Sequence, residues 1–323
     1  MKKFAKFALA STMMLAVLAG CSTQSSLESG SAKPSEQPAA NSSENAANSA
    51  SDKVTIGLSI STQNNPFFVT LKEGAEKAAK EAGAELIVVD AQDDTAKQIS
   101  GVEDLIQKKV DVILINPTDS AAIATAVESA NQANIPVITV DRAAEGGQVV
   151  SHIASDNVKG GQMAGEYILK ALNGKGNIVE LQGIAGTSAA RDRGQGFHAA
   201  VDGKEGIKVV ASQPADFDRA KGMNVMENIL QGNPDIQAVF AHNDEMALGA
   251  LQALEAAGKN IPVVGFDATD DAVKAVNDGK MAATVAQKPE AIGETSVQTA
   301  LKVVKGEKVE SFIPVDLELV TKQ

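Results

Sequence analysis

The chain has 323 residues, too many for one ordinary hydrophobic core but suited to two domains of about 100–200 residues each. Its formal net charge of −12 disfavours binding to phosphate backbones, so nucleic acid is not an expected partner. Aromatic residues make up 3% of the chain, with no Trp and one Tyr. A Phe beside polar residues is therefore of interest, although core packing is the ordinary role of Phe.

Residues 1–20 have the pattern of a lipoprotein signal peptide. Lysines precede an apolar run over residues 7–19, which is too short for a permanent membrane span, and small residues come directly before Cys21. Cys21 is the only cysteine, so it cannot form an internal disulfide, and we expect it to carry the lipid anchor. An ordinary secretory signal with an incidental cysteine is the alternative. The expected location is the outer face of the cytoplasmic membrane, which is the periplasmic side if an outer membrane is present.

Residues 21–52 are predicted to be the lipid-anchored, disordered linker, because they contain almost no large apolar side chain. From Lys53 onward, short β-branched runs alternate with amphipathic, Ala-rich stretches. Strands are predicted at 54–60, 86–89, 112–115, 137–140, 149–153, 178–181, 209–211, 238–241, 263–266 and 283–285. Helices are predicted at 68–82, 95–108, 121–133, 160–172, 219–231, 245–257 and 291–305, and four of them are expected to stop at Gly83, Gly174, Gly232 and Gly258. This alternation predicts an α/β fold with parallel sheets that are covered on both faces.

Polar residues follow most of the predicted strands, where ligands of open parallel sheets bind. These segments are 61–68, Asp90, 116–119, 141–142, 155–157, 186–193, 216–218, 243–244, Asp267 and Gln287. Planar Asp, Asn, Gln and Arg side chains can hold neighbouring hydroxyls, and Phe rings can pack on the C–H faces of a sugar. The mixture suits a neutral polyol.

Helix capping is the alternative role for some of these polar residues. Asp94, Asp119, Asp156 and Asp244 stand directly before predicted helices, and we expect them to be N-caps. Capping explains Asp141, Arg142, Arg193 and Gln287 less well, because Arg is not a capping residue and Gln is a poor one.

The chain offers little that an enzyme would need. Its three histidines lack metal-ligand spacing, its one thiol is assigned to the anchor, and no phosphate loop of the form GxxxxGK[ST] occurs. The Gly-rich segment 183–188 departs from the dinucleotide-binding fingerprint. We therefore expect no catalytic residue, no cofactor and no metal.

Six segments together resemble one known family, over the stretch from about residue 53 to the C-terminus. They are 61–68, 134–142, 151–157, 181–193, 211–219 and 243–250. They are similar to bacterial ribose-binding proteins, the solute receptors of sugar ABC importers, in the type I periplasmic-binding-protein family. The resemblance implies two Rossmann-like lobes joined by a three-strand hinge, with crossings near Ser155/Asp156, Gln287/Lys288 and Pro314/Val315. The N-terminal lobe would comprise 53–155 plus 288–314, and the C-terminal lobe 156–287 plus 315–323.

The resemblance also implies a set of binding residues. Those expected to hydrogen-bond the sugar are Asn65, Asp141, Arg142, Arg193, Asn243, Asp267 and Gln287, and those expected to enclose it are Phe67, Phe68 and Phe217. The choice of Arg193 over Arg191 rests on the resemblance, because both are expected to leave the same loop. His242 stands where close relatives have Gln, and we expect this change to be neutral or to act behind the site.

The function that follows is capture of D-ribose between two closing lobes and delivery to ABC permease subunits. Allose, xylose or a furanose signal is the alternative ligand, although the absence of Trp favours a small sugar. A sugar-sensing transcription regulator is a weaker alternative, because such a protein would begin with a basic helix-turn-helix. A monomer is expected, and a chemoreceptor is a further candidate partner.

Overall fold

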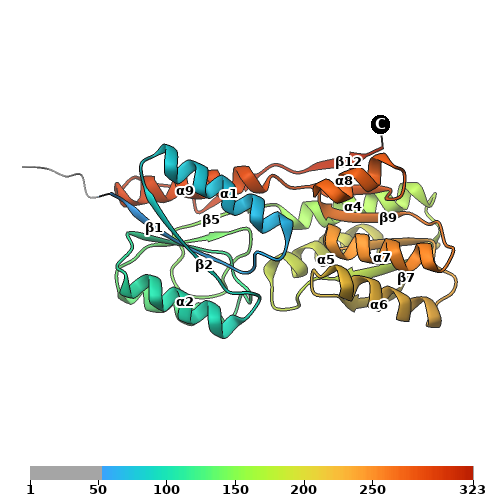
Figure 1. The fold of residues 1–323 in the computed structure, drawn as a ribbon. Coiled ribbons are helices and arrows are strands. Elements are labelled where there is room, and N and C mark those ends of the chain that lie inside the picture. The colour runs from blue at the N-terminus through green and yellow to red at the C-terminus, as the bar shows by residue number, and fades with distance from the viewer. Residues whose placement is uncertain (1–52, 323) are drawn as a thin grey trace, which may run out of the picture. The chain divides into compact units, whose positions relative to one another are not determined.

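The computed structural model describes residues 53–322, which contain two six-stranded β-sheets with helices on both faces (Figure 1). The predicted signal peptide, the lipidation site Cys21 and the linker lie outside the described residues. Within residues 53–322, no helix has both the length and the apolar character that a membrane span requires.

The first sheet is parallel throughout and is built from the first half of the chain plus one late strand. Its strands, in spatial order, are β11 (Phe312–Val315), β5 (Ser151–Ser155), β4 (Val137–Val140), β3 (Val112–Ile115), β1 (Thr55–Ile60) and β2 (Glu85–Asp90). Helices α1 (Pro66–Glu81) and α9 (Pro289–Val304) cover one face, and α2 (Thr95–Gln107) and α3 (Ala124–Gln132) cover the other (Figure 1). The central strands are fully buried and β-branched, as expected for a sheet covered on both sides. This sheet and its helices are called the first lobe below.

The second sheet repeats this arrangement with one reversal. Its strands, in spatial order, are β12 (Glu318–Thr321), β10 (Ala283–Ala286), β9 (Val263–Asp267), β8 (Ala238–Ala241), β6 (Gly176–Gln182) and β7 (Ile207–Pro214). The edge strand β12 runs antiparallel to β10, whereas the other pairs are parallel. Helices α4 (Asn157–Ala171) and α5 (Ser188–Val201) cover one face, and α6 (Arg219–Gly232), α7 (Asp244–Ala256) and α8 (Asp270–Asn277) cover the other. This sheet and its helices are called the second lobe.

The chain passes between the two sheets three times, after β5, after β10 and after β11. Since β11 extends to Val315, the last passage consists of Asp316 and Leu317. The predicted lobe boundaries, and a hinge role for these three segments, remain predictions.

Four elements were absent from the sequence prediction: α5, α8, β11 and β12. The segment 186–193 was expected to be a loop, but helix α5 begins within it at Ser188, with the Thr187 hydroxyl accepting from the amide of Ala190. Two glycines, Gly194 and Gly196, and several polar residues interrupt the apolar period of this helix. The expectation of a loop was therefore wrong.

Three of the four predicted helix stops adopt the left-handed conformation that favours glycine. The φ angles are 70° at Gly83, 74° at Gly174 and 66° at Gly258. Gly232 differs, because it is the last residue of α6 and Asn233 follows with an extended φ of −133°.

Three of the four predicted Asp caps accept hydrogen bonds from amides of the helix or turn that follows them. Asp94 accepts from Lys97 N at 2.9 Å and Asp156 from Lys159 N at 2.9 Å. Asp119 accepts from two amides in the turn that leads into α3. The fourth prediction was wrong, since Asn243 caps α7 and Asp244 is turned into the protein interior.

Candidate functional site

All ten residues predicted to bind the ligand line one cavity between the two lobes. The space inside it, including its opening to solvent, measures about 240 Å³. Its lining consists of Asn65, Phe67, Phe68, Asp141, Arg142, Ala189, Arg193, Phe217, Asn243, Asp267 and Gln287. Ala189 is the one lining residue that the sequence did not single out. These residues lie at or just beyond the carboxyl ends of strands, where open parallel sheets bind ligands.

The start of α1 brings two Phe rings to the cavity. Asn65 is the N-cap, and its Oδ1 accepts from Phe67 N at 3.0 Å, with Pro66 at the first helical position. Phe67 and Phe68 therefore stand on the first turn, both buried, with ring centroids 5.2 Å apart in an edge-to-face arrangement. They form an apolar wall from the first lobe.

Asp141 and Arg142 follow β4 in a tight conformation. Asp141 has a φ of 62°, which a non-glycine residue adopts only where the surroundings hold it, and its Oδ2 lies 3.4 Å from the Asn116 amide that donates to it. Arg142 donates from Nη1 to Pro117 O at 3.1 Å. Its guanidinium lies 5.0 Å from the centre of the Phe68 ring and 5.2 Å from that of Phe217. Arg142 thus contacts aromatic rings of both lobes.

Arg193 comes from helix α5 of the second lobe and is almost fully buried. Its Nε donates to Asn157 Oδ1 at 2.8 Å and its Nη1 to His242 O at 2.6 Å, while the guanidinium stacks 3.8 Å above the Phe266 ring. Arg191 and Arg193 were expected to leave the same loop, and this expectation was wrong. Both stand on α5, and two positions apart on a helix they face different directions. Arg191 is half exposed and pairs with Glu145 of the first lobe at 2.5 Å.

Phe217 and Asn243 are fixed within the second lobe. Phe217 has a φ of 59°, and its ring occupies space that a side chain at Gly183 would need, since a Cβ there would lie 2.0 Å from the ring. Asn243 caps α7 by accepting from Met246 N at 3.0 Å, and its Nδ2 donates to Phe217 O at 3.3 Å. The amide group of Asn243 therefore already has partners on its own lobe.

Asp267 and Gln287 lie beside each other at the ends of β9 and β10. Gln287 Nε2 donates to Asp267 Oδ1 at 2.9 Å, and Arg193 Nη1 lies 3.7 Å from the same oxygen, beyond hydrogen-bond distance. The backbone of Asp267 has a φ of 121°, far from the regions that a residue with a side chain prefers. Strain of this kind collects at binding and active sites, where neighbouring contacts maintain it.

Three buried polar atoms of the cavity residues have no hydrogen-bond partner among the described residues: Asp141 Oδ1, Arg142 Nε and Gln287 Oε1. Leaving such a group unpaired costs about 1–3 kcal/mol, so a bound molecule that pairs with them is strongly favoured. Two acceptors and one donor beside aromatic rings match a hydroxylated ring compound.

Burial also sets the electrostatics of the cavity. Desolvation raises the pKa of Asp267 to about 7, against the opposing effect of the Arg193 charge and the Gln287 hydrogen bond. Desolvation likewise raises the pKa of Asp141 and lowers the pKa of Arg142 and of Arg193. The carboxylates and guanidinium groups offset one another, so the cavity suits an uncharged ligand.

Several residues behind the cavity position its lining. Asn116 and Asn157, already noted beside Asp141 and Arg193, are buried and belong to polar segments that the sequence marked without a role. His242 is buried, its Nε2 lies 2.9 Å from Glu180 Oε1, and its Nδ1 accepts from Gly183 N at 3.3 Å. His242 therefore lies behind the site, and the Glu180 partner gave no signal in the sequence.

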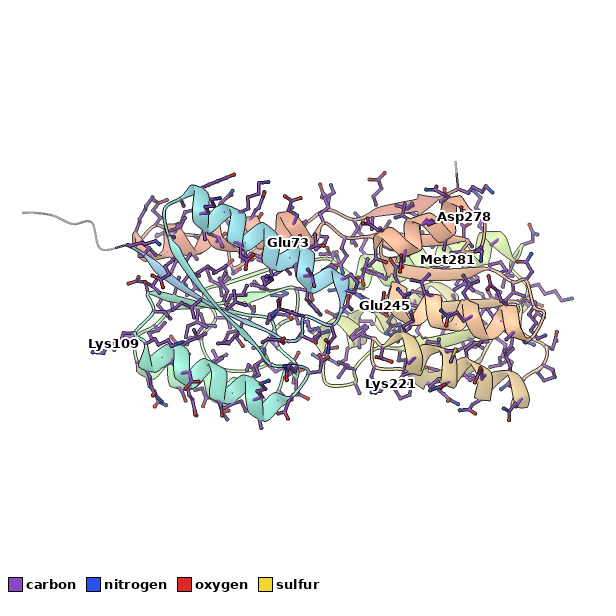
Figure 2. The ribbon with its side chains drawn as sticks, viewed as in Figure 1. Glu73, Lys109, Lys221, Glu245, Asp278 and Met281 are labelled. Carbon is purple, nitrogen blue, oxygen red and sulfur yellow. The ribbon has the colours of Figure 1, made fainter. Side chains whose placement is uncertain are left out.

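The two lobes also touch beside the cavity. Ser188 N donates to Ser120 Oγ at 3.0 Å, and Ala143 N donates to Ser188 Oγ at 2.8 Å. In an adjacent pocket that shares Phe217 with the cavity, Arg219 donates to Glu245 through two hydrogen bonds of 2.9 and 2.7 Å, and Glu245 lies at the end of α7 that faces the first lobe (Figure 2). Among residues 53–322, no cluster of His, Cys, Asp and Glu side chains is suited to hold a metal ion.

Residues 56–308 match the family model described as "Periplasmic binding protein domain". The chain belongs to this family of periplasmic binding proteins. It is 61% identical over 272 residues to the Ribose import binding protein RbsB of Escherichia coli (strain K12), covering 84% of this chain and 92% of that protein. It is 57% identical to the protein of the same name from Bacillus subtilis (strain 168), over 83% of this chain and 88% of that protein.

Among solved structures, an ABC transporter solute binding protein from Bacillus halodurans C-125 with bound myo-inositol has the same fold. The TM-score is 0.80 at 37% identity, and the match covers 83% of this chain and 94% of that one. The predicted fold class, α/β with two lobes built on mainly parallel sheets, is confirmed by this likeness and by the two sheets described above. These family members are named as binding proteins and not as enzymes.

Proposed function

We propose that the protein is an extracytoplasmic receptor that captures D-ribose between its two lobes and delivers it to an ABC permease. One observation carries the proposal: ten residues from both lobes and from their connection surround one cavity in which buried polar atoms lack partners. The relatives named as ribose import binding proteins support ribose as the sugar.

Each lobe supplies part of the binding surface. Asn65, Phe67, Phe68, Asp141 and Arg142 belong to the first lobe, whereas Arg193, Phe217, Asn243 and Asp267 belong to the second. Only with the lobes together does a sugar meet all of them. The three passages between the sheets would act as the hinge, so sugar occupancy and lobe closure are linked, and a permease can distinguish a loaded receptor from an empty one.

The polar side chains have distinct tasks in this proposal. Asp141 Oδ1 and Gln287 Oε1 accept from sugar hydroxyls, and Arg142 Nε donates to a hydroxyl oxygen. Phe68 and Phe217 line the cavity from opposite lobes and pack on the C–H faces of the ring. No residue has a catalytic role, and no cofactor takes part.

The proposal includes the membrane anchor. Cleavage before Cys21 and acylation of its thiol would hold the receptor, acting as a monomer, at the outer face of the cytoplasmic membrane close to its permease. Replacing Cys21 with Ser should release the protein into the soluble fraction without changing sugar affinity. A variant that stays membrane-bound would contradict the anchor.

The binding role is tested by a pair of isosteric substitutions. Asp141→Asn removes a charged acceptor from the cavity and should weaken D-ribose binding about 10- to 100-fold, the effect of losing a charge-assisted hydrogen bond. Asp94→Asn is the matched control, since Asn caps a helix as well as Asp does and Asp94 belongs neither to the cavity lining nor to a passage between the lobes. Equal affinity for both variants and the unmodified protein would remove Asp141 from the site.

A further inference from the structure

A second buried carboxylate lies close behind the cavity without lining it. Asp244 is completely buried at the first position of α7, and no ion pair involves it among the described residues. Three donors surround it instead: Thr284 Oγ at 2.7 Å, Thr269 N at 2.8 Å and Thr269 Oγ at 3.3 Å. A buried carboxylate costs free energy, so a group held only by these neutral donors calls for an explanation.

The donors belong to the turn that carries Asp267 and to the strand beside it. This turn joins β9 to α8, and two consecutive residues in it, Asp267 and Ala268, have φ angles of 121° and 57°. Each conformation of this kind costs about 1–3 kcal/mol and persists only where surrounding contacts hold it. Without such contacts the turn would relax and carry the Asp267 carboxylate away from the cavity.

Thr284 connects Asp244 to this turn. It is completely buried on β10, its Oγ accepts from Ala268 N at 3.2 Å, and it has one hydroxyl proton. Because the oxygen accepts from the amide, that proton is directed to Asp244 Oδ1. Asp244 thus holds the amide of residue 269 directly and that of residue 268 through Thr284.

The backbone leaves room for this carboxylate. Gly265 on β9 lies next to the Asp244 carboxylate, and a Cβ at position 265 would be 2.2 Å from Asp244 Oδ1. A side chain there would push the carboxylate out of reach of the turn.

We infer that Asp244 and Thr284 are positioning residues that hold the strained β9–α8 turn and thereby aim the Asp267 carboxylate at the bound sugar. Neither contacts the cavity, so both act through Asp267. The inference deepens the proposed function and rests on it for its effect on ribose binding.

The test is a double-mutant cycle in the full chain. Thr284→Val keeps the shape of the side chain but removes the hydroxyl, and Thr284→Ser keeps the hydroxyl and is the matched control. Thr284→Val should weaken ribose binding about 10- to 100-fold, the range found when residues that orient metal ligands are replaced, whereas Thr284→Ser should stay near the unmodified protein. In an Asp267→Asn background, Thr284→Val should cause no further loss, because the residue through which it acts has already been changed.

A merely structural role would give different results. Equal losses for Thr284→Val with and without Asp267→Asn, or equal losses for the Val and Ser variants, would overturn the inference. If Thr284→Val does not fold, Thr284→Ala removes the same hydroxyl.

A measurement without sugar separates this inference from the proposed function. Amide hydrogen exchange at residues 268 and 269 should be faster in Thr284→Val than in the unmodified protein and Thr284→Ser. Unchanged exchange would contradict the inference that Asp244 and Thr284 hold this turn, whichever sugar the protein binds. If the unmodified protein binds no ribose but exchange at residues 268 and 269 is faster in Thr284→Val, the proposed function fails and the role of Asp244 and Thr284 in holding the turn is supported.

Discussion

Replacing Asp267 with Asn should strengthen the fold and weaken the site. Asp267 is 5% exposed, and burial raises its pKa from the ordinary 3.8 to about 7. The folded protein therefore binds a proton that the unfolded chain has lost between these pH values, and the stability that Asp267 provides falls as pH rises from 3.8 towards 7. At 1.36 kcal/mol per pKa unit, this difference corresponds to on the order of 4 kcal/mol at about pH 8.

An Asn at this position keeps an oxygen that accepts from Gln287 Nε2 but carries no charge. Relative to the unmodified protein, the free energy of unfolding of Asp267→Asn should therefore rise between about pH 4 and about pH 8, by up to about 4 kcal/mol. Ribose affinity should fall about tenfold or more, since a charged acceptor becomes a neutral one.

Urea denaturation without sugar at both pH values, together with calorimetric titration at the higher one, measures the two effects. A stability difference that does not change with pH would refute the assignment of a raised pKa to Asp267. Unchanged affinity would remove it from the binding site.

Three further predictions concern positions outside the cavity lining. Burial opposes ionisation of Glu180, but hydrogen bonds from His242 and Ser212 lower its pKa to about 2. The stability that ionised Glu180 provides is therefore lost as pH falls from 4.5 to 2. Glu180→Gln should lower the free energy of unfolding at neutral pH by on the order of 3 kcal/mol, with the difference shrinking towards pH 2, and a constant difference would refute this. Arg191→Ala should change stability by less than about 1 kcal/mol in thermal denaturation, because its ion pair is half exposed, and a larger loss would contradict that. Gly196→Ala should reduce the melting temperature measurably, since its Cβ would lie 1.9 Å from a carbonyl oxygen of α4, and an unchanged melting temperature would show that the helices can separate.

The sequence predicted the elements whose apolar pattern is strong and missed those whose pattern is weak. Strands such as β3, with four fully buried apolar residues, were located to the residue. The edge strands β11 and β12 were missed because they are only partly buried, and Pro314 lies within β11. Helix α5 was missed because polar residues and glycines outnumber the apolar residues in its first half.

The sequence predicted the site in two steps, of which the second was the more specific. Polar residues after strands indicated a cleft for a polyol, but only the resemblance to a family selected which of them line it. Local capping logic failed at Asp244, since Asn243 provides an equally good cap one residue earlier and leaves Asp244 free to turn inward. Its partners Thr269 and Thr284 meet it only because β9 and β10 are neighbours in the sheet, which no local pattern encodes.

Calorimetric titration of the purified protein with D-ribose tests the central claim most directly, with allose, xylose, galactose and glucose titrated in parallel. A one-to-one complex with ribose, and clearly weaker binding of the other sugars, is the expected result. Absence of binding to ribose, with tight binding to another sugar of the panel, would contradict the assignment of ribose and leave the cavity as the site for that sugar.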